Sequence, residues 1–211
     1  MSFEGSSGPT SRGQRTRARL THAARDVFVR DGYVTVRVED IVAAAGVSHG
    51  TFYTYYANKG AALHALIDDT VDALLGVSEE SWVGSDVEGT IERVIGRFVD
   101  VFATHAPVIR VWLEASAHDH EFFERLQHVR REYVARVASA IRPVLAHTVH
   151  DPHDAASALV AMVEGYATHG MVHDDPVRRQ VVTRTLASLW FGGLEHLSGD
   201  RSAEVGDIAT A

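Results

Sequence analysis

The sequence lacks cysteine, so none of its 211 residues can form a disulfide, a thiolate metal site or a cysteine nucleophile. It also lacks a long apolar run, because the most apolar internal stretch, residues 158–167, is interrupted by Glu164 and is too short to span a bilayer. Its first residues have no apolar core of signal-peptide length. We therefore expect a cytoplasmic protein with no membrane partner.

Lysine is almost absent too, since Lys59 stands alone among nineteen arginines. The net charge is −8, but residues 1–60 hold eight basic and five acidic residues, a net of +3 that leaves −11 for the remainder. A basic module joined to a larger acidic one is typical of a DNA-binding domain on a separate body, because only that domain must neutralise phosphates. Chance segregation of charge is the alternative.

Strand-like alternation is missing as well, and apolar residues recur instead at helical spacing. Residues 1–11 are rich in Gly, Ser and Thr and are predicted to form a disordered arm. Pro107 is expected to begin a helix of its own, and Pro143 to kink or end a long one. The chain is predicted to be all-α with about nine helices, which begin near residues 12, 38, 49, 58, 85, 107, 122, 153 and 176.

Residues 38–56 fit a helix-turn-helix, in which Gly46 supplies the turn residue that tolerates positive φ. Hydroxyl and imidazole groups on the outer face of its second helix can bond base edges or phosphates without burying a formal charge. Ser48 is the expected N-cap of that helix, where its side chain and backbone N–H groups can meet a phosphate. The inner residues are Ile41, Ala45, Val47, Phe52 and Tyr55, and the outer ones His49, Thr51, Tyr53 and Thr54.

Gly32-Tyr33 and the stretch from Val38 to Leu63, VEDIVAAAGVSHGTFYTYYANKGAAL, resemble the N-terminal domain of the TetR family of transcriptional regulators. The resemblance extends over about residues 14–66. It implies a three-helix DNA-binding domain at residues 12–58 and a larger helical effector-binding and dimerisation domain at residues 59–211. It further implies a homodimer built on the last two helices, which binds a pseudo-palindromic operator in double-stranded DNA, and repression that a small apolar or amphipathic effector relieves.

Carried over residue by residue, the resemblance makes Gly50–Tyr56 the recognition helix, and it matches Lys59 to a lysine that meets a phosphate in this family. Where the family has a Ser or Thr that caps the preceding helix, this chain has Arg37, with Thr35 two residues earlier, and either can take that role. Tyr55 is divided between the core and the DNA backbone. The expected DNA-binding residues are Thr35, Arg37, Ser48, His49, Gly50, Thr51, Tyr53, Tyr55 and Lys59.

Most large apolar side chains after residue 59 are expected to be core. If the family's design holds, a subset lines an effector pocket, and our candidates are Phe98, Phe102, Trp112, Tyr133, Met162 and Tyr166. The last two helices carry more apolar side chains than a terminal hairpin needs, which suits a four-helix dimer interface. These are Leu159, Met162, Val163, Tyr166, Val182, Leu186, Leu189, Trp190 and Leu194.

Thirteen histidines suggest metal binding, for instance by His169 with His173, but no zinc motif surrounds them and we expect solvated histidines. Glu114 and Glu164 lie in apolar contexts. Each could face a ligand, but we expect them to pair with an arginine, such as Arg110, or to point outward. No pattern of catalytic residues is present, so we expect no enzyme, metal or cofactor. The alternative is a helical ligand-binding or enzymatic protein with a vestigial helix-turn-helix.

Overall fold

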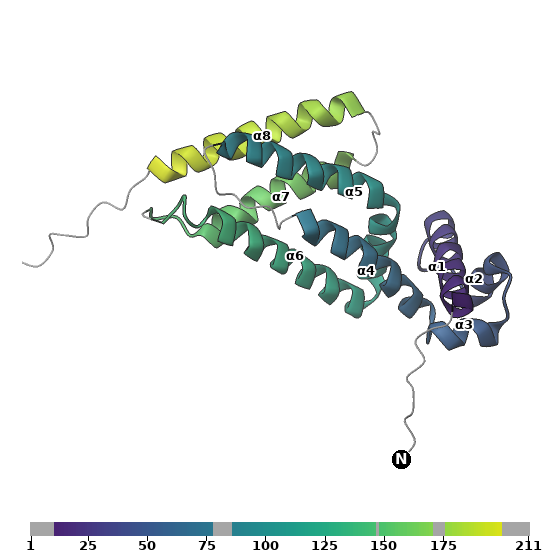
Figure 1. Ribbon diagram of the computed structural model, residues 1–211. Helices are drawn as coiled ribbons and strands as arrows, with labels where there is room; N and C mark the ends of the chain where they lie inside the picture. Colours follow the sequence, from purple (N-terminus) through teal and green to yellow (C-terminus); the bar gives the residue numbers. More distant parts are fainter. Residues whose placement is uncertain (1–10, 78–85, 147, 171–175, 200–211) are drawn as a thin grey trace, which may run out of the picture. The chain divides into compact units, whose positions relative to one another are not determined.

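The computed structural model describes residues 11–77, 86–146, 148–170 and 176–199 (Figure 1). Within these ranges the chain forms eight α-helices and no β-strand, which confirms the predicted all-α fold. The helices are α1 (Ser11–Asp31), α2 (Val38–Ala45), α3 (His49–Tyr55), α4 (Lys59–Val77), α5 (Val87–His118), α6 (His120–Ile141), α7 (Pro152–Gly170) and α8 (Pro176–Gly199). The predicted N-terminal arm lies almost wholly outside the described residues.

The helices form two compact units. The head unit consists of the described residues up to Val71 together with Pro107–Glu124, and the body unit consists of Asp72–Ala106 and the described residues from Arg125 onward. Helices α4, α5 and α6 each contribute residues to both units. The head unit therefore contains a segment that lies far along the sequence from the helix-turn-helix.

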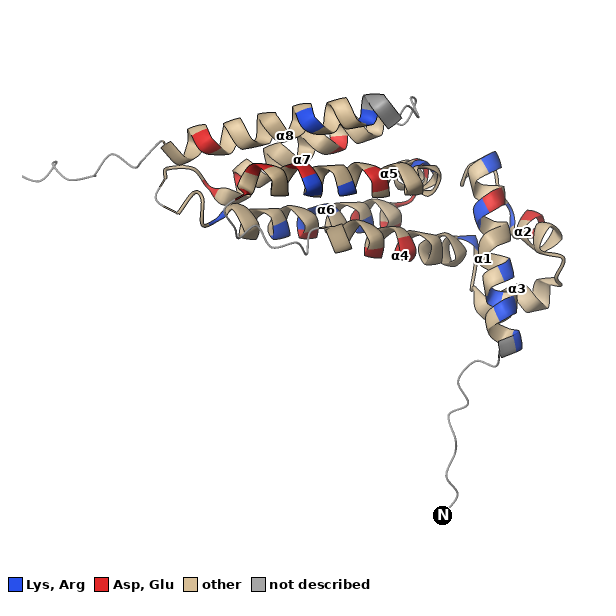
Figure 2. Cartoon of the chain, turned by 45° about the horizontal axis from the view of Figure 1, so that its top comes forward, with Lys and Arg blue, Asp and Glu red and all other residues tan. Residues whose placement is uncertain are grey.

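The core of the head unit forms where the helical spacing of α1 predicts it. Leu20, Ala24, Val27 and Phe28 are almost completely buried, and Phe52 of α3 is buried with them. Burial of large apolar side chains contributes roughly 1.5–3 kcal/mol each, so this short three-helix arrangement depends on these few residues. The arginines of α1 are exposed, and the blue segments of Figure 2 show that basic residues recur along this helix.

The turns of the head unit require glycine, as predicted. Gly32, directly after α1, has φ of 77°, and Gly46, between α2 and α3, has φ of 61°. Residues with a Cβ rarely adopt this left-handed conformation. No other described residue has a positive φ.

Helix α5 differs from the prediction, because Pro107 lies inside it rather than at the start of a new helix. Proline removes one backbone hydrogen bond, but the neighbouring Ala106, Val108 and Ile109 are all buried. Packing on both sides of the proline thus keeps the helix continuous, which accounts for eight described helices instead of about nine. At the N-terminus of α5 the Asp86 carboxylate accepts the Gly89 N–H at 2.9 Å, close to the helix start expected near residue 85.

The body unit buries apolar residues that recur at helical spacing on α5, namely Ile91, Val94, Ile95, Phe98, Val99 and Phe102. Helix α6 ends at Ile141, two residues before Pro143, and α7 and α8 begin at the predicted prolines. One expectation is wrong: four residues assigned to the dimer surface belong to the interior of the single chain. These are Val163, Leu186, Trp190 and Leu194, each at most 5% exposed. Their helical period matches a core face as well as an interface, and sequence alone does not separate the two.

Candidate nucleic-acid interface and effector cavity

The helix-turn-helix has the local geometry that its sequence predicts. Gly46 accepts the left-handed conformation that ends α2, and Ser48 caps α3 by accepting the Thr51 N–H at 3.2 Å. The Ser48 and Thr51 hydroxyl groups also lie 3.0 Å apart. The first turn of α3 is therefore fixed before any partner binds, with both hydroxyl groups at the protein surface.

The outer face of α3 is polar and exposed. Tyr53 is 56% exposed, and the Thr54 hydroxyl donates to the Gly50 carbonyl oxygen at 2.9 Å. His49 Nε2 lies 3.5 Å from a Glu39 carboxylate oxygen on α2. Tyr55 is half-buried, which is compatible with the expectation that it contributes to both the core and the DNA contact. The next residue, Tyr56, is buried, and its hydroxyl oxygen lies 2.7 Å from that of Thr21.

A groove connects this face with the first three turns of α1, and the sequence analysis did not predict that α1 contributes to it. Its volume is about 730 Å³. From α1 it is lined by Arg12, Gly13, Thr16 and Arg19, and from the helix-turn-helix by Gly46, Val47, Ser48, Gly50, Thr51, Thr54 and Tyr55. The excess of basic residues in residues 1–60 was the available signal, but the sequence could not show which of its arginines share a groove with α3.

The start of α2 lacks the expected side-chain cap. The N-cap residue is Arg37, whose side chain makes no cap hydrogen bond, and its backbone N–H instead donates to the Asp40 carboxylate at 2.8 Å. Thr35 and the Arg37 side chain are exposed. Because the cap is satisfied from within α2, both side chains remain available to a partner.

Lys59 is engaged inside the protein. Its ammonium group donates to the carbonyl oxygens of Tyr33, Val34 and Val36 at 2.8, 3.2 and 2.8 Å, which accounts for its three N–H groups. The ammonium also lies 4.6 Å from the centre of the Tyr33 ring. Burial lowers the pKa of Lys59, and the charge of Glu114 opposes that shift. A phosphate contact by Lys59 stays a prediction.

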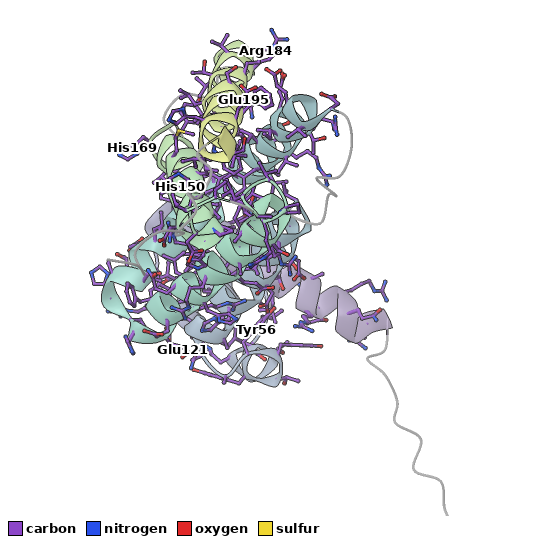
Figure 3. The ribbon with its side chains drawn as sticks, turned by 90° about the vertical axis from the view of Figure 1, so that its left-hand side faces the viewer. Tyr56, Glu121, His150, His169, Arg184 and Glu195 are labelled. Carbon is purple, nitrogen blue, oxygen red and sulfur yellow. The ribbon has the colours of Figure 1, made fainter. Side chains whose placement is uncertain are left out.

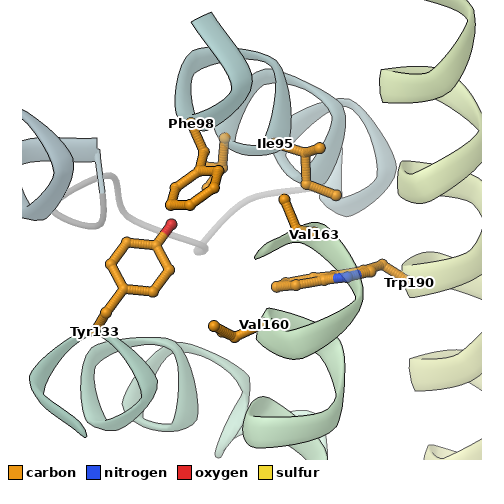
Figure 4. A pocket seen from close by; sticks show the side chains of 7 residues that line it. Ile95, Phe98, Tyr133, Val160, Val163 and Trp190 are labelled. Carbon is orange, nitrogen blue, oxygen red and sulfur yellow. The ribbon is translucent and has the colours of Figure 1, made fainter. Parts of the chain in front are cut away.

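The body unit contains a small apolar cavity (Figure 4). Its walls come from α5, α6, α7 and α8, through Val94, Ile95, Phe98, Tyr133, Val160, Val163 and Trp190. The cavity volume is about 10 Å³, close to the space that one water molecule occupies. As the structure has it, this cavity therefore has no room for an effector larger than a water molecule.

Polar groups near the cavity are few. The Tyr133 hydroxyl points toward Phe98 in Figure 4, and the two rings lie 5.3 Å apart. Burial raises the pKa of Tyr133, so its hydroxyl is neutral at physiological pH. Trp190 Nε1 donates to the Leu159 carbonyl oxygen at 3.2 Å.

Glu164 is paired with an arginine, as expected, through the contact of its carboxylate with Arg130 Nε at 3.0 Å. Burial raises the pKa of Glu164, and the positive charge of Arg130 opposes that shift.

The expected effector residues divide into three groups. Phe98 and Tyr133 line the cavity, and the Phe102 ring lies 5.8 Å from that of Phe98. Met162 and Tyr166 are half-buried on α7 and are not part of its lining. Trp112 belongs to the head unit, where its Nε1 donates to the Phe122 carbonyl oxygen at 3.2 Å. The sequence analysis missed Val94, Ile95 and Val160 as wall residues, and it placed Val163 and Trp190 on the dimer face.

The histidines give no sign of a metal centre in the part of the chain that the structure describes. No group of three or more metal-ligating side chains occurs there. His169, labelled in Figure 3, is exposed, and its Nδ1 lies 2.7 Å from the Gly165 carbonyl oxygen. His147 and His173 lie outside the described residues.

None of the described helices is both long and apolar enough to cross a bilayer.

Comparisons with known proteins agree with this geometry. Residues 20–66 match the model for bacterial regulatory proteins of the tetR family, and residues 90–190 match that for the C-terminal part of BetI-type transcriptional repressors. The HTH-type transcriptional regulator EthR of Mycolicibacterium smegmatis is 26% identical over 186 residues, 84% of this chain and 85% of that protein. The HTH-type transcriptional repressor SCO4008 of Streptomyces coelicolor is 30% identical over 154 residues, 70% of this chain and 76% of that protein.

Solved structures share the fold at lower identity. GusR of Salmonella enterica superposes with a TM-score of 0.70 at 18% identity, covering 89% of this chain and all of that one. The similarity to GusR therefore concerns the arrangement of helices rather than any bound molecule.

Proposed function

Because the chain belongs to the TetR family of bacterial regulatory proteins, and so is a DNA-binding transcriptional regulator of the ligand-responsive repressor type, we propose that α3 and the first three turns of α1 form its operator-binding surface. The observation that carries the proposal is the groove between them, which is lined by two arginines, five side chains that carry a hydroxyl group, and the exposed residues Gly46 and Gly50. Arginines at such a position neutralise phosphates, while hydroxyl groups reach base edges.

Within this surface, we assign base contacts to the outer face of α3. Thr51 and His49 supply hydrogen-bonding groups that discriminate between bases in the major groove, and Tyr53 and Tyr55 contact the sugar-phosphate backbone. Arg12 and Arg19 contact phosphates from the other side of the groove, and Thr35 and Arg37 do so at the start of α2. Ser48 and Gly50 shape the first turn of α3 and let the DNA approach closely.

We propose that the operator is read by a homodimer. The described part of α8 presents Val181 and Leu189 at 59% and 56% exposure, eight residues apart and so on one face. On α7 the exposed Ala158 and Ala161 permit close approach of a partner helix. Two copies joined through these helices would place recognition helices in successive major grooves, at half-sites roughly 34–36 Å apart or somewhat more.

The proposed effector enters the body unit at the apolar cavity. Because that cavity has room for about one water molecule, an effector must displace its walls, and the conformation with separated walls is then the one that the effector stabilises. Its chemistry follows from the lining: largely apolar, with one polar group opposite the Tyr133 hydroxyl. Displacement of α5 to α8 would alter the dimer so that it no longer fits the operator. The site of action is the cytoplasm, where the DNA is.

The proposal is tested by titrating the purified protein against a duplex from its own upstream intergenic region and against a scrambled duplex, by fluorescence anisotropy at two salt concentrations. Arg19→Ala should weaken binding to both duplexes and lower the salt slope by about one, as loss of a phosphate contact does. Arg25→Ala is the matched control, because Arg25 is exposed on α1 but does not line the groove. Thr51→Val should weaken only operator binding.

Equal losses for Arg19→Ala and Arg25→Ala would contradict the groove as the binding surface. No preference for the operator by the wild-type protein, at either salt concentration, would instead favour a ligand-binding protein with a vestigial helix-turn-helix.

A further inference from the structure

The turn between α1 and α2 is held by an acidic side chain from a distant part of the sequence. Glu114, on the part of α5 that belongs to the head unit, accepts the backbone N–H of Tyr33 with one carboxylate oxygen and that of Val34 with the other, each at 3.2 Å. The sequence analysis expected Glu114 to pair with an arginine such as Arg110 or to point outward. Its carboxylate instead binds the backbone of the turn. Its carboxylate satisfies two consecutive backbone donors that follow the end of α1.

Gly32 makes room for this carboxylate. A Cβ atom at position 32 would lie 2.7 Å from a Glu114 oxygen, which is closer than nonbonded atoms approach. The φ of 77° at Gly32 independently disfavours any other residue. The glycine thus serves both the conformation of the turn and the approach of Glu114.

Lys59 holds the same turn through its carbonyl groups. Its ammonium group donates hydrogen bonds to the carbonyl oxygens of Tyr33, Val34 and Val36. Glu114 and Lys59 together bind both kinds of backbone group in residues 33–36, and we name these two side chains and the turn they hold the turn clamp. Hydrogen bonds to charged groups are typically stronger than those between neutral groups.

The turn clamp lies directly before the DNA-binding helices. Residues 33–36 lead into Arg37 and the first turn of α2, and α2 in turn leads into α3 through Gly46. We propose that Glu114 is a positioning residue for DNA binding, which fixes the α1–α2 turn and thereby sets the placement of α2 and α3 against α1. The inference rests on the proposed operator-binding surface and adds to it a residue that does not touch DNA.

Simple electrostatics predicts the opposite effect of removing this charge. DNA repels a carboxylate, so neutralising an acidic residue in the head unit should tighten DNA binding or leave it unchanged. A positioning role predicts weaker operator binding despite the favourable change in charge. Binding to random DNA should change little, because it depends mainly on phosphate contacts that do not need the same placement of α3.

The test is Glu114→Gln in the full-length protein, compared with Glu88→Gln, an exposed acid in the first turn of the same helix. Glutamine keeps the size of the side chain but offers a single oxygen to two N–H groups. We expect operator binding to weaken about tenfold or more and random-duplex binding to change less than about threefold, a drop in the specificity ratio. Glu88→Gln should alter neither, and circular dichroism and thermal melting should show both variants folded.

Two further measurements separate positioning from general destabilisation. Amide exchange at Tyr33 and Val34 should be faster in Glu114→Gln, while amides within α7 keep their rates. In a double-mutant cycle, Gly32→Ala should weaken operator binding less in the Glu114→Ala background than in the wild type, because the close approach to the carboxylate is gone.

Operator binding by Glu114→Gln that is equal to or tighter than wild type, or additive losses in the cycle, would overturn the proposal. If the wild-type protein shows no operator preference, the proposed function itself fails and the positioning role fails with it. The exchange rates would then show whether Glu114 merely stabilises the turn.

Discussion

Lys59 illustrates how one side chain can have two competing explanations. Its family position suggests a phosphate contact, whereas its ammonium donates to three carbonyl oxygens of the α1–α2 turn. Both roles need the positive charge, so a loss of DNA binding alone would not distinguish them. Thermal stability and salt dependence do, because only a phosphate contact releases counterions from DNA.

We therefore predict that Lys59→Met lowers Tm and weakens operator binding without changing the salt slope. Methionine retains a long apolar stem but leaves three carbonyl groups without their donor. Differential scanning calorimetry and anisotropy titrations at several salt concentrations measure the two effects. A slope lower by about one, with Tm unchanged, would restore the direct phosphate contact. Arg142→Met, at an exposed position directly after α6, should change neither quantity.

Glu164 gives a prediction about pH. Burial raises its pKa above the ordinary value in spite of the ion pair with Arg130 at 3.0 Å. The native state therefore binds more protons than the unfolded state between the ordinary and the raised pKa. The free energy of unfolding contributed by Glu164 is consequently highest below the ordinary pKa, and it falls as pH rises through this window.

We predict that Glu164→Gln removes this pH dependence. Relative to wild type, the Tm of the variant should increase as pH is raised from about 4 to 7, because glutamine has no proton to lose. Melting curves at a series of pH values measure the difference. Glu195→Gln on α8 changes an exposed acid and should give a Tm difference that does not vary with pH in this way. A decreasing difference for Glu164→Gln would mean that the ion pair outweighs burial.

At the scale of elements, α5 is distinctive because it continues through a proline. Pro107 cannot donate to the carbonyl group one turn before it, and the boundary between the two compact units falls at this same residue. Sequence rules predict a new helix at such a position, since they register the missing N–H group but not the burial of Ala106, Val108 and Ile109 around it.

Pro107→Ala should therefore stabilise the protein. Alanine restores the backbone donor and has the highest helix propensity, and each kcal/mol regained corresponds to a rise in Tm of about 2–4 °C for a chain of this size. Scanning calorimetry measures the change. Arg110→Ala, an exposed substitution with little effect on helix propensity, is the control. A lower Tm for Pro107→Ala would show instead that Val108 and Ile109 pack correctly only with the proline in place.

The other elements follow from local rules with few exceptions. Gly32 and Gly46 end α1 and α2 because each adopts a positive φ that most other residues disfavour. Asp151 and Pro152 begin α7, because Asp151 accepts the His153 N–H and proline has a fixed φ that suits the first helical position.

The candidate site is less predictable. The contact of Glu114 with residues 33 and 34 joins positions about eighty residues apart, and no local pattern in the sequence indicates it.

At the scale of the whole molecule, charge is distributed according to function. Residues 1–60, with a net charge of +3, contain the helix-turn-helix and all the residues that line the groove, and the rest of the chain carries −11. Composition predicted this sign for the DNA-binding part, but part of the acidic remainder, Pro107–Glu124, belongs to the head unit as well. The sequence was insufficient to divide the apolar residues of α7 and α8 between core and interface, because both faces have the same period and Trp190 and Leu186 proved to be buried.

The exposed residues that remain on α8 define the last prediction. Leu189→Asp should convert the protein to a monomer, because a charge at the centre of a helix-helix interface is desolvated without a partner. Operator affinity should fall by about a hundredfold or more, since the two recognition helices no longer bind as one linked unit. Sedimentation velocity measures the oligomeric state, and anisotropy at protein concentrations below and above the expected dimerisation constant measures the binding.

The matched control is Val149→Asp, which places the same charge at an equally exposed apolar residue outside α7 and α8, where Val149 is 66% exposed. That variant should remain a dimer with unchanged operator affinity. If Leu189→Asp also sediments as a dimer, the interface does not include this face of α8. The half-buried face of α7 around Met162 and Tyr166, which the cavity leaves unused, would then be the surface through which two copies join.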